Sequence, residues 1–386
     1  MRIIFICGSL EIGRDGVGDY IRRLAAGLIN GGNEAAAVAL NDCFVYEETI
    51  ANQFFEGIVL PTLRVPAVWP NRIRYKRAKV WIDKFDPEWL SLQFVPFAFH
   101  NKGITYSLNK NLKTLGKGRS WHIMFHELWV GMEISSDLKH FLWGRLQRWL
   151  IKLLLDNLKP SVVHTQTKLY QLQLLKLGFK AAYLPLFSNI PLISNDRMDV
   201  NFLRSAPGLK KHTISLVIFG AIHPGAPIKR FCEEAALYSK HKRVKVCLTI
   251  LGIGGKERER WATLWRLQGL EVNALGELPA EQISEVLFKA SIGITTNPVT
   301  LIEKSGTVAA MLEHGLPVIC VSKQWQPDEI ACTKEPPGII AYTAGNIEEC
   351  FSLNKMPPIR NKVFEVTDQF IGTLSKPVCY SDILMQ

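Results

Sequence analysis

Residues 301–322 read LIEKSGTVAAMLEHGLPVICVS, and the order of residue types in this stretch decides the fold of the second half of the chain. A small-residue turn opens an apolar helical pattern, and Gly-Leu-Pro ends that pattern just before an apolar run. Glycine directly after a helix and proline soon after it are typical of a helix C-terminus. The stretch therefore predicts a helix followed at once by a buried strand. The residues at the mouth of this helix are Glu303, Ser305, Gly306 and Thr307.

The same alternation of apolar runs and helical patterns fills both halves of the chain. Helical patterns such as 19–32, 229–240 and 283–290 follow several of the apolar runs. Strands that alternate with helices predict parallel sheets covered by helices. The predicted fold class is therefore α/β, with two Rossmann-like domains. The apolar runs lie at 2–7, 34–40, 89–97, 121–126, 161–167, 214–220, 245–252, 291–296 and 316–322.

A chain of 386 residues exceeds the size of one ordinary core, so two domains are expected. We place an N-terminal domain at residues 1–190 and a C-terminal domain at 191–361. The stretch near residues 188–212 is polar and contains Pro and Gly, which is typical of a linker. The tail 362–386 is expected to return to the first domain.

Composition restricts the class of protein. The 46 Lys and Arg residues exceed the 35 Asp and Glu residues, so nucleotide phosphates, anionic lipid or nucleic acid are expected partners. Nucleic acid ranks last, because the basic residues form no recognised module. The eight cysteines show neither Cys-x-x-Cys nor Cys/His spacing, which favours reduced thiols in a cytoplasmic protein over a zinc site. No apolar run reaches the roughly 18 residues that span a bilayer.

A glycine-rich loop follows the first apolar run and leads into a helix expected to start near Asp19. Its glycines would let backbone N–H groups approach an anion at the helix N-terminus. A dinucleotide-binding turn would have a third glycine where this chain has Ile21, which argues against a dehydrogenase. A loop that merely turns the strand into the helix is the alternative. The glycines are Gly8, Gly13, Gly16 and Gly18.

The mouth of the helix in 301–322 offers similar chemistry. Exposed N–H groups, two hydroxyls and the positive end of a helix suit a diphosphate, and the Glu303 carboxylate can accept hydrogen bonds from sugar hydroxyls. A capped helix with an incidental glutamate is the alternative.

Three segments together carry a resemblance: Gly16-Val17-Gly18, residues 275–278, and Glu303 through Pro317 with the Val-Ile pair that follows. They resemble retaining glycosyltransferases of the family-4 type, which have the glycosyltransferase B fold and include enzymes of bacterial exopolysaccharide and envelope polysaccharide synthesis. The resemblance implies a C-terminal domain that binds a nucleotide-diphospho-sugar, most often with UDP. It implies an N-terminal domain that binds the acceptor.

The resemblance also assigns roles to single residues. Glu303 would contact hydroxyls of the donor sugar, and His126 would lie beside that sugar. The diphosphate would be held by the backbone of the helix mouth and reached by the N-terminal loop. Glu277 and Leu278 would frame the base, and residues 251–254 would lie beside the nucleotide. The predicted donor-binding residues, with Arg230 included for its charge, are then Gly16, Val17, Arg230, Gly252 (within 251–254), Glu277, Leu278, Ser305, Gly306 and Thr307.

Two positions depart from the family pattern. Ala310 stands where a second glutamate usually grips the ribose, and the nearest carboxylate is Glu313. Ala221 replaces an arginine that neutralises the diphosphate, and Lys229 or Arg230 could supply this charge to the leaving group. Both could instead be solvated helix charges, but the Pro-Gly-Ala-Pro loop before Lys229 favours the catalytic role for that lysine.

The expected chemistry positions two substrates and stabilises a leaving diphosphate. No Asp-x-Asp lies where a divalent metal would be needed, so a metal-independent enzyme without a cofactor is predicted. The resemblance implies retention of configuration, with UDP-glucose as the expected co-substrate. Alternatives are a nucleotide-sugar epimerase or hydrolase, and a non-catalytic nucleotide-binding protein.

Two basic and aromatic stretches, 71–85 and 138–159, bear on the acceptor. In the second, Lys and Arg surround apolar residues at helical spacing, which favours either an interfacial membrane contact or a core helix with a solvated basic face. The membrane reading predicts a lipid-linked saccharide acceptor and a cytoplasmic protein at the inner face of the plasma membrane. A plain saccharide acceptor is the alternative. The apolar residues are Leu138, Leu142, Leu146, Trp149 and Leu153.

Overall fold

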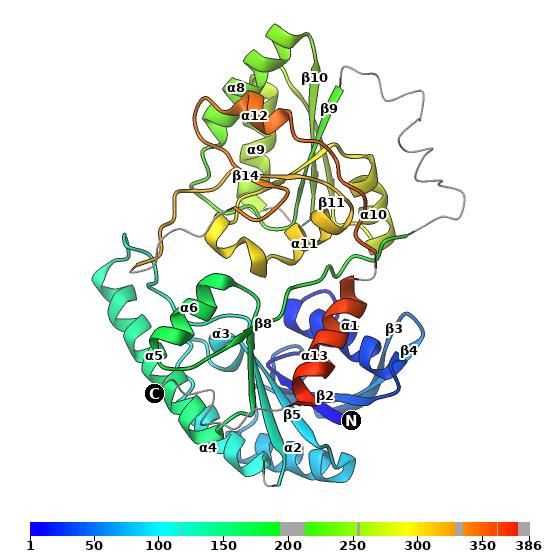
Figure 1. Ribbon diagram of the computed structural model, residues 1–386, viewed down its shortest axis with the longest axis vertical. Coiled ribbons are helices and arrows are strands. Elements are labelled where there is room, and N and C mark those ends of the chain that lie inside the picture. Colours follow the sequence, from blue (N-terminus) through cyan, green and yellow to red (C-terminus); the bar gives the residue numbers. More distant parts are fainter. Residues whose placement is uncertain (117, 194–212, 253–254, 329–334, 361, 377–386) are drawn as a thin grey trace. The chain divides into compact units, whose positions relative to one another are not determined.

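The computed structural model describes residues 1–386 except 117, 194–212, 253–254, 329–334, 361 and 377–386 (Figure 1). The chain divides into two compact units. Unit 1 comprises Met1–Pro185, Gln326–Cys332 and Val363–Gln386, and unit 2 comprises Leu186–Trp325 and Thr333–Lys362. Most of the predicted linker and the end of the predicted tail lie outside the described residues. The predicted domain bounds, 1–190 and 191–361, stay a prediction.

Unit 1 is built on one eight-stranded sheet with the order β3-β4-β2-β1-β5-β6-β7-β8. Only β3 and β4 pair antiparallel, at one edge, and the other neighbours are parallel. Five of the six residues of the first strand are buried, because helices cover both faces of a parallel sheet. The strands are β1 (Arg2–Cys7), β2 (Glu34–Asp42), β3 (Thr49–Phe55), β4 (Ile58–Pro66), β5 (Trp89–Phe94), β6 (Ser120–Phe125), β7 (Val162–Thr165) and β8 (Ala182–Tyr183).

The helices of unit 1 connect these strands. They are α1 (Gly16–Asn30), α2 (Asn71–Phe85), α3 (Pro96–Phe99), α4 (Tyr106–Leu115), α5 (Leu138–Leu158) and α6 (Lys168–Lys176). The first helix begins at Gly16 rather than near Asp19, so that expectation was wrong. The cause is Asp15, whose carboxylate accepts a hydrogen bond from the Gly18 N–H at 2.7 Å and caps the helix.

The last described helix, α13 (Lys362–Leu374), packs within unit 1 beside α1 (Figure 1). Its Phe370 ring lies 6.1 Å from the ring of Phe5 in β1 and 5.0 Å from the ring of His122 in β6. A Cβ on Gly27 of α1 would come within 2.5 Å of the Thr367 hydroxyl oxygen, so the two helices are in close contact. Part of the predicted tail therefore completes the core of unit 1.

Unit 2 contains a six-stranded sheet that is parallel throughout, with the order β11-β10-β9-β12-β13-β14. Its strands are β9 (Thr213–Phe219), β10 (Lys245–Leu251), β11 (Glu271–Gly276), β12 (Ile292–Thr295), β13 (Val318–Cys320) and β14 (Ile339–Ala341). Its helices are α8 (Ile228–Lys242), α9 (Gly255–Leu267), α10 (Ala280–Lys289), the 3-10 helix η1 (Val299–Lys304), α11 (Gly306–Glu313) and α12 (Ile347–Phe351).

Two apolar clusters form the core of unit 2. One contains the fully buried Trp261 and Trp265 of α9 together with β9 and β10. The other joins α10, α11 and β13. The α/β class with two parallel-sheet bodies is confirmed.

Helix α5 packs on the core through a different row of residues from the one singled out in the sequence. The predicted apolar row is largely exposed, with Leu138 73% and Trp149 54% accessible. The buried row is Gly144, Gln147, Leu150, Ile151, Leu154, Leu155 and Leu158. Within the described part of the chain, no helix has both the length and the apolar content needed to cross a membrane.

Candidate functional site

The N-terminus of α11 forms the centre of the candidate site in unit 2. Ser305 is its N-cap and accepts a hydrogen bond from the Val308 N–H at 3.4 Å. Gly306 opens the helix, and nothing would obstruct a Cβ there. Glu303 lies in η1, directly before the cap, and is half-buried. The sequence motif thus gives the local geometry that it predicted, a carboxylate followed by a helix N-terminus.

Two glycine turns border this helix end. Gly220 follows β9 with φ +89°, and Gly252 follows β10 with φ +98°. A Cβ on Gly220 would lie 2.6 Å from Cγ2 of Thr307. A Cβ on Gly252 would in turn lie 3.4 Å from Cα of Gly220, so the two turns are neighbours. The carboxyl end of β9 therefore contacts the Thr307 side chain at the α11 N-terminus, and the carboxyl end of β10 lies next to β9 there. Glycine at both positions adds no side chain of its own, which favours an anion held by backbone N–H groups.

A polar network that the sequence reading missed fixes this end of α11. The Asn297 side-chain amide donates to the Ser305 hydroxyl at 3.1 Å and to the Thr295 hydroxyl at 3.0 Å. The Ser305 and Thr307 hydroxyl oxygens lie 3.1 Å apart. Nε2 of His223 lies 3.1 Å from Oδ1 of Asn297. The signal available in the sequence was the polar run Thr295-Thr296-Asn297 at the end of the apolar run 291–296.

The residues expected to frame the nucleotide base lie at the end of β11. The Gly252 N–H donates to the Gly276 carbonyl at 2.7 Å, which ties the ends of β10 and β11 together. Glu277 is exposed, and Leu278 packs against the core cluster that contains α11. Residues 253–254 of the predicted loop 251–254 lie outside the described residues.

The two cations expected near the diphosphate lie on α8. Lys229 and Arg230 are both exposed in its first turn. Nε of Arg230 donates to the Glu234 carboxylate at 3.1 Å, one turn along the same helix. A different cation borders the loop before α8, because the Lys323 side chain would touch a Cβ on Gly225 at 3.7 Å. The sequence reading did not consider Lys323.

The missing ribose contact is not replaced by the neighbouring carboxylate. Ala310 is fully buried. The Glu313 carboxylate is only 4% exposed and accepts a hydrogen bond from the Ser188 N–H at 2.6 Å. That contact anchors the chain where it enters unit 2, so Glu313 has a structural role.

In unit 1, His126 follows β6 and is only 7% exposed. Its Nε2 lies 2.8 Å from Oε1 of Gln93, and its Nδ1 lies 3.3 Å from Oε1 of Gln166. The ring of Tyr20, on α1, meets it edge-on at 5.0 Å. Tyr20 lies one helical turn after Gly16 and Val17, so these two predicted residues and His126 belong to one region of unit 1.

The polar contacts of His126 continue into the core. The Gln93 amide donates to the Ser91 hydroxyl at 2.7 Å, and that hydroxyl lies 2.7 Å from Nδ1 of His122. Nε2 of His122 lies 3.0 Å from Nδ1 of His164. Burial lowers the pKa of His164 to about 4 and lowers the pKa of His122 well below its ordinary value. Both inner histidines are therefore neutral at pH 7.

The N-terminus of α1 differs from that of α11 in its electrostatics. Asp15 already places a carboxylate against the first N–H groups, and burial raises the pKa of this carboxyl group. The α11 N-terminus has only a neutral hydroxyl as its cap. Of the two glycine-rich segments, the one in unit 2 is thus better suited to an added anion. Among the described residues, no three His, Cys, Asp or Glu gather as metal ligands.

Comparisons with known proteins rest on structure. No protein-family model matches the sequence, and no curated protein matches it. Trehalose-6-phosphate synthase from E. coli, bound with UDP-2-fluoro glucose, has 10% identity and a TM-score of 0.59 over 98% of this chain and 100% of its own. Anabaena HepE in complex with UDP has 14% identity and a TM-score of 0.57 over 97% and 100%.

An epimerase shares the same architecture. The UDP-GlcNAc 2-epimerase from Methanocaldococcus jannaschii has 10% identity and a TM-score of 0.54, over 97% of this chain and 99% of its own. At sequence identities this low, the matches show a shared fold only. Two parallel-sheet units in one chain, matched over nearly their whole length by these structures, show that the protein has the glycosyltransferase B fold.

Proposed function

We propose that the protein is a retaining glycosyltransferase that moves a hexose, glucose from UDP-glucose, to a saccharide or lipid-linked saccharide acceptor in polysaccharide synthesis. The observation that carries the proposal is the α11 N-terminus, with the Gly220 turn against Thr307 and the Gly252 turn beside Gly220. A helix N-terminus with free backbone approach binds phosphate oxygens well. The choice of UDP and glucose is supported by fold relatives that were solved with UDP-2-fluoro glucose and with UDP.

In this proposal, unit 2 holds the donor. The diphosphate receives hydrogen bonds from the N–H groups of the helix that opens at Gly306 and from the hydroxyls of Ser305 and Thr307. Glu303 accepts hydrogen bonds from hydroxyls of the donor sugar. Gly252, Glu277 and Leu278 border the nucleotide.

A cation near the leaving diphosphate stabilises the negative charge that grows as the glycosidic bond breaks. Lys229 is exposed at the start of α8, directly after the loop that Lys323 borders. We assign this role to Lys229. Arg230 is the weaker candidate, because Glu234 already accepts a hydrogen bond from its guanidinium.

Unit 1 binds the acceptor in this proposal. The glycosidic bond to the diphosphate breaks, and the new bond forms on the same face of the sugar. The leaving phosphate oxygen takes the proton of the acceptor hydroxyl, so no side-chain nucleophile and no metal ion are needed. His126, held by two glutamine amides, orients the sugar, and Gly16 and Val17 approach the phosphates. We place the enzyme in the cytoplasm, in peripheral contact with the membrane.

Two other functions fit the same fold. A nucleotide-sugar epimerase is favoured by the match to the UDP-GlcNAc 2-epimerase. A non-catalytic nucleotide-binding protein is favoured by the buried Ala310 and by the structural role of Glu313, since together they leave the ribose without the usual carboxylate.

Calorimetric titration with UDP, GDP, ADP and TDP, without metal, tests the donor site. UDP is expected to bind selectively, and Ser305→Pro should weaken UDP binding. Glu303→Ala should weaken binding of UDP-glucose but not of UDP, because Glu303 is assigned to the donor sugar. Glu281→Ala is a matched control, because Glu281 is an exposed glutamate in the first turn of α10. Thermal unfolding of each variant separates lost binding from lost folding. Failure of all four diphosphates to bind would refute the proposal.

Turnover separates the three functions. Incubation with UDP-glucose and an acceptor panel should release UDP in proportion to new glycoside. Conversion of a UDP-sugar to its epimer without an acceptor would favour the epimerase. Selective UDP binding without turnover on any acceptor would favour the non-catalytic protein.

A further inference from the structure

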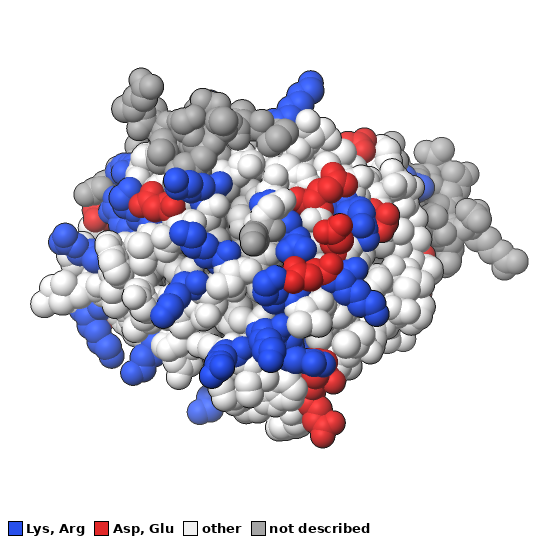
Figure 2. All heavy atoms as spheres, turned by 90° about the horizontal axis from the view of Figure 1, so that it is seen from below, with Lys and Arg blue, Asp and Glu red and all other residues white. Residues whose placement is uncertain are grey.

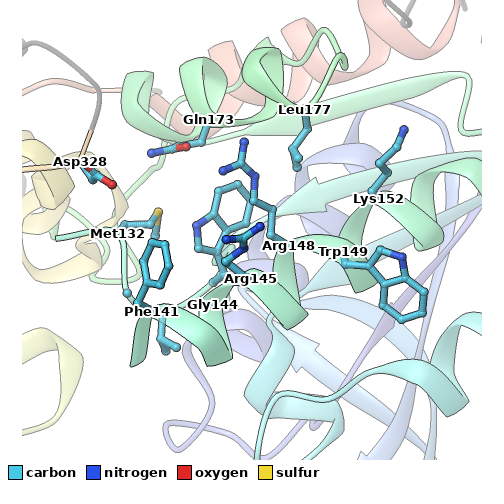
Figure 3. Close-up of a pocket in the computed structure, with 13 residues that line it drawn as sticks. Met132, Phe141, Gly144, Arg145, Arg148, Trp149, Lys152, Gln173, Leu177 and Asp328 are labelled. Carbon is cyan, nitrogen blue, oxygen red and sulfur yellow. The ribbon is translucent and has the colours of Figure 1, made fainter. Parts of the chain in front are cut away.

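Unit 1 contains a pocket that none of the predicted donor-binding residues lines (Figure 3). It has a volume of about 460 Å³, within the range of small-molecule sites. Its walls come from α5, α6, the segment after β6, and one residue of the segment 326–328. The lining residues used below are Trp129, Phe141, Arg145, Arg148, Gln173 and Asp328.

The walls of this pocket are fixed by close backbone contacts. The Val130 N–H donates to Oε1 of Gln147 on α5 at 2.9 Å, and the Val130 carbonyl leaves no room for a side chain at Gly144. The Asp328 N–H donates to the Met132 carbonyl at 2.7 Å. A pocket held in this way is already formed before a ligand arrives, which reduces the entropy lost on binding.

Two guanidinium groups line the pocket, each above an aromatic ring. The Arg148 guanidinium lies 5.6 Å from the ring centre of Trp129, and that of Arg145 lies 5.8 Å from the ring centre of Phe141. Neither arginine forms an ion pair with another described residue. Stacking on a ring orients a guanidinium and leaves its N–H edge available to an anion. Figure 3 shows both arginines rising from α5.

Gln173 supplies an independent observation. Its side chain is only 5% exposed and extends from α6 toward the pocket (Figure 3). Its amide makes no hydrogen bond to another described residue and borders the pocket, so it is available to a ligand hydroxyl. Asp328, which is exposed at the same pocket, can accept from a sugar hydroxyl.

The charge of unit 1 favours an anionic ligand. Residues 71–180 contain 19 of the 46 Lys and Arg residues of the chain but only 7 of the 35 Asp and Glu residues. Figure 2, seen from the side of α2 and α4, shows Lys and Arg spread widely while Asp and Glu gather mainly on one part of the face. A positive field of this kind raises the local concentration of anions.

We propose that this pocket binds the phosphate group of a phosphorylated acceptor, with Arg145 and Arg148 as its anion-binding residues. The inference rests on the proposed function, because it names the chemical class of the acceptor that unit 1 receives. The paired N–H groups of a guanidinium match two phosphate oxygens. Gln173 and Asp328 then read sugar hydroxyls next to the phosphate. The phosphate can belong to a soluble sugar phosphate or to a lipid phosphate.

Calorimetry with glucose 1-phosphate and with farnesyl phosphate tests this site, with UDP present to fill the donor site. Arg148→Gln should weaken binding of the preferred probe at least tenfold, and Arg145→Gln should act in the same direction. Lys110→Gln removes one positive charge from the exposed surface of α4 and should change the affinity less than twofold. Gln173→Leu should weaken glucose 1-phosphate but not farnesyl phosphate, because only the first carries hydroxyls.

The outcomes separate this inference from the proposed function. Stronger binding of glucose 1-phosphate identifies a soluble acceptor, and stronger binding of farnesyl phosphate identifies a lipid acceptor. Weaker binding of the preferred probe to Arg148→Gln supports the site. Equal binding to wild type and Arg148→Gln, or no binding of either probe, overturns it. If UDP alone fails to bind while the arginine dependence holds, the donor proposal fails and the anion site stands.

Discussion

Acid should destabilise unit 1 through the buried pair His122 and His164. Both side chains are completely inaccessible, and the Phe370 ring lies 5.0 Å from that of His122 and 6.2 Å from that of His164. The two imidazoles contact each other, so protonating either one places a charge in a core without a nearby carboxylate. The folded state therefore keeps both rings neutral.

The pKa of His164 gives the size of the effect. Burial lowers it from 6.5 to about 4, a difference equivalent to about 3 kcal/mol. Between these two values the unfolded chain binds a proton and the folded chain does not. The free energy of unfolding therefore rises with pH across this window. The contribution is fully present above pH 6.5 and is lost as the pH falls toward 4. His122, whose pKa is also lowered, acts in the same direction.

Hydrogen exchange measured by mass spectrometry can report this change for unit 1 alone. The peptides that cover β6 and β7 contain the two histidines, and their slowest amides exchange through unfolding of the sheet. After correction for intrinsic exchange, the opening free energy of the wild type should fall by about 2 kcal/mol more than that of His164→Gln between pH 7 and pH 4.5. His140→Gln, which replaces an exposed histidine of α5, should keep the pH dependence of the wild type. Identical pH dependence in wild type and His164→Gln would refute the reasoning.

Three substitutions test other contacts. Gly220→Ala should abolish UDP binding and lower the melting temperature, because it adds a Cβ 2.6 Å from Thr307 at a residue with φ +89°. The control Gly269→Ala, at φ +73° with open space around it, should lower the free energy of unfolding only by the roughly 1–2 kcal/mol that a left-handed alanine costs. Ser305→Ala should cost about 1 kcal/mol in urea denaturation, because it removes the α11 cap. Phe370→Ala should cost about 3–5 kcal/mol in the opening of β6, because it leaves a cavity over the histidines.

The sequence predicted the elements that depend on local patterning. Gly315 and Pro317 mark the end of α11, and the small residues at its mouth mark its start, because helix ends are specified by residues within one turn. Alternating apolar runs predicted both parallel sheets. The order of strands within each sheet is a matter of long-range pairing, and local patterns do not encode it.

The candidate site was predictable where a motif is contiguous, and it was missed where partners come from distant segments. Asn297 and His223 join Ser305 in one network, yet 74 residues separate them from each other. Glu313 was considered for the ribose, but Ser188, 125 residues away, accounts for its carboxylate. A side chain's partner decides its role, and spacing along the chain does not reveal that partner.

Helix α5 shows that a helical pattern does not by itself identify the face that packs on the core. Leucines and aromatic residues occur on two overlapping rows of this helix, and both have a period near 3.6 residues. Only the row that contains Leu150 and Leu154 meets the core, and its small Gly144 lets the segment after β6 approach. The other row stays exposed beside Arg145 and Arg148. A core helix needs only the buried row. The exposed apolar row lies next to a preformed cationic pocket, and this combination is consistent with a surface that receives an amphiphilic anion.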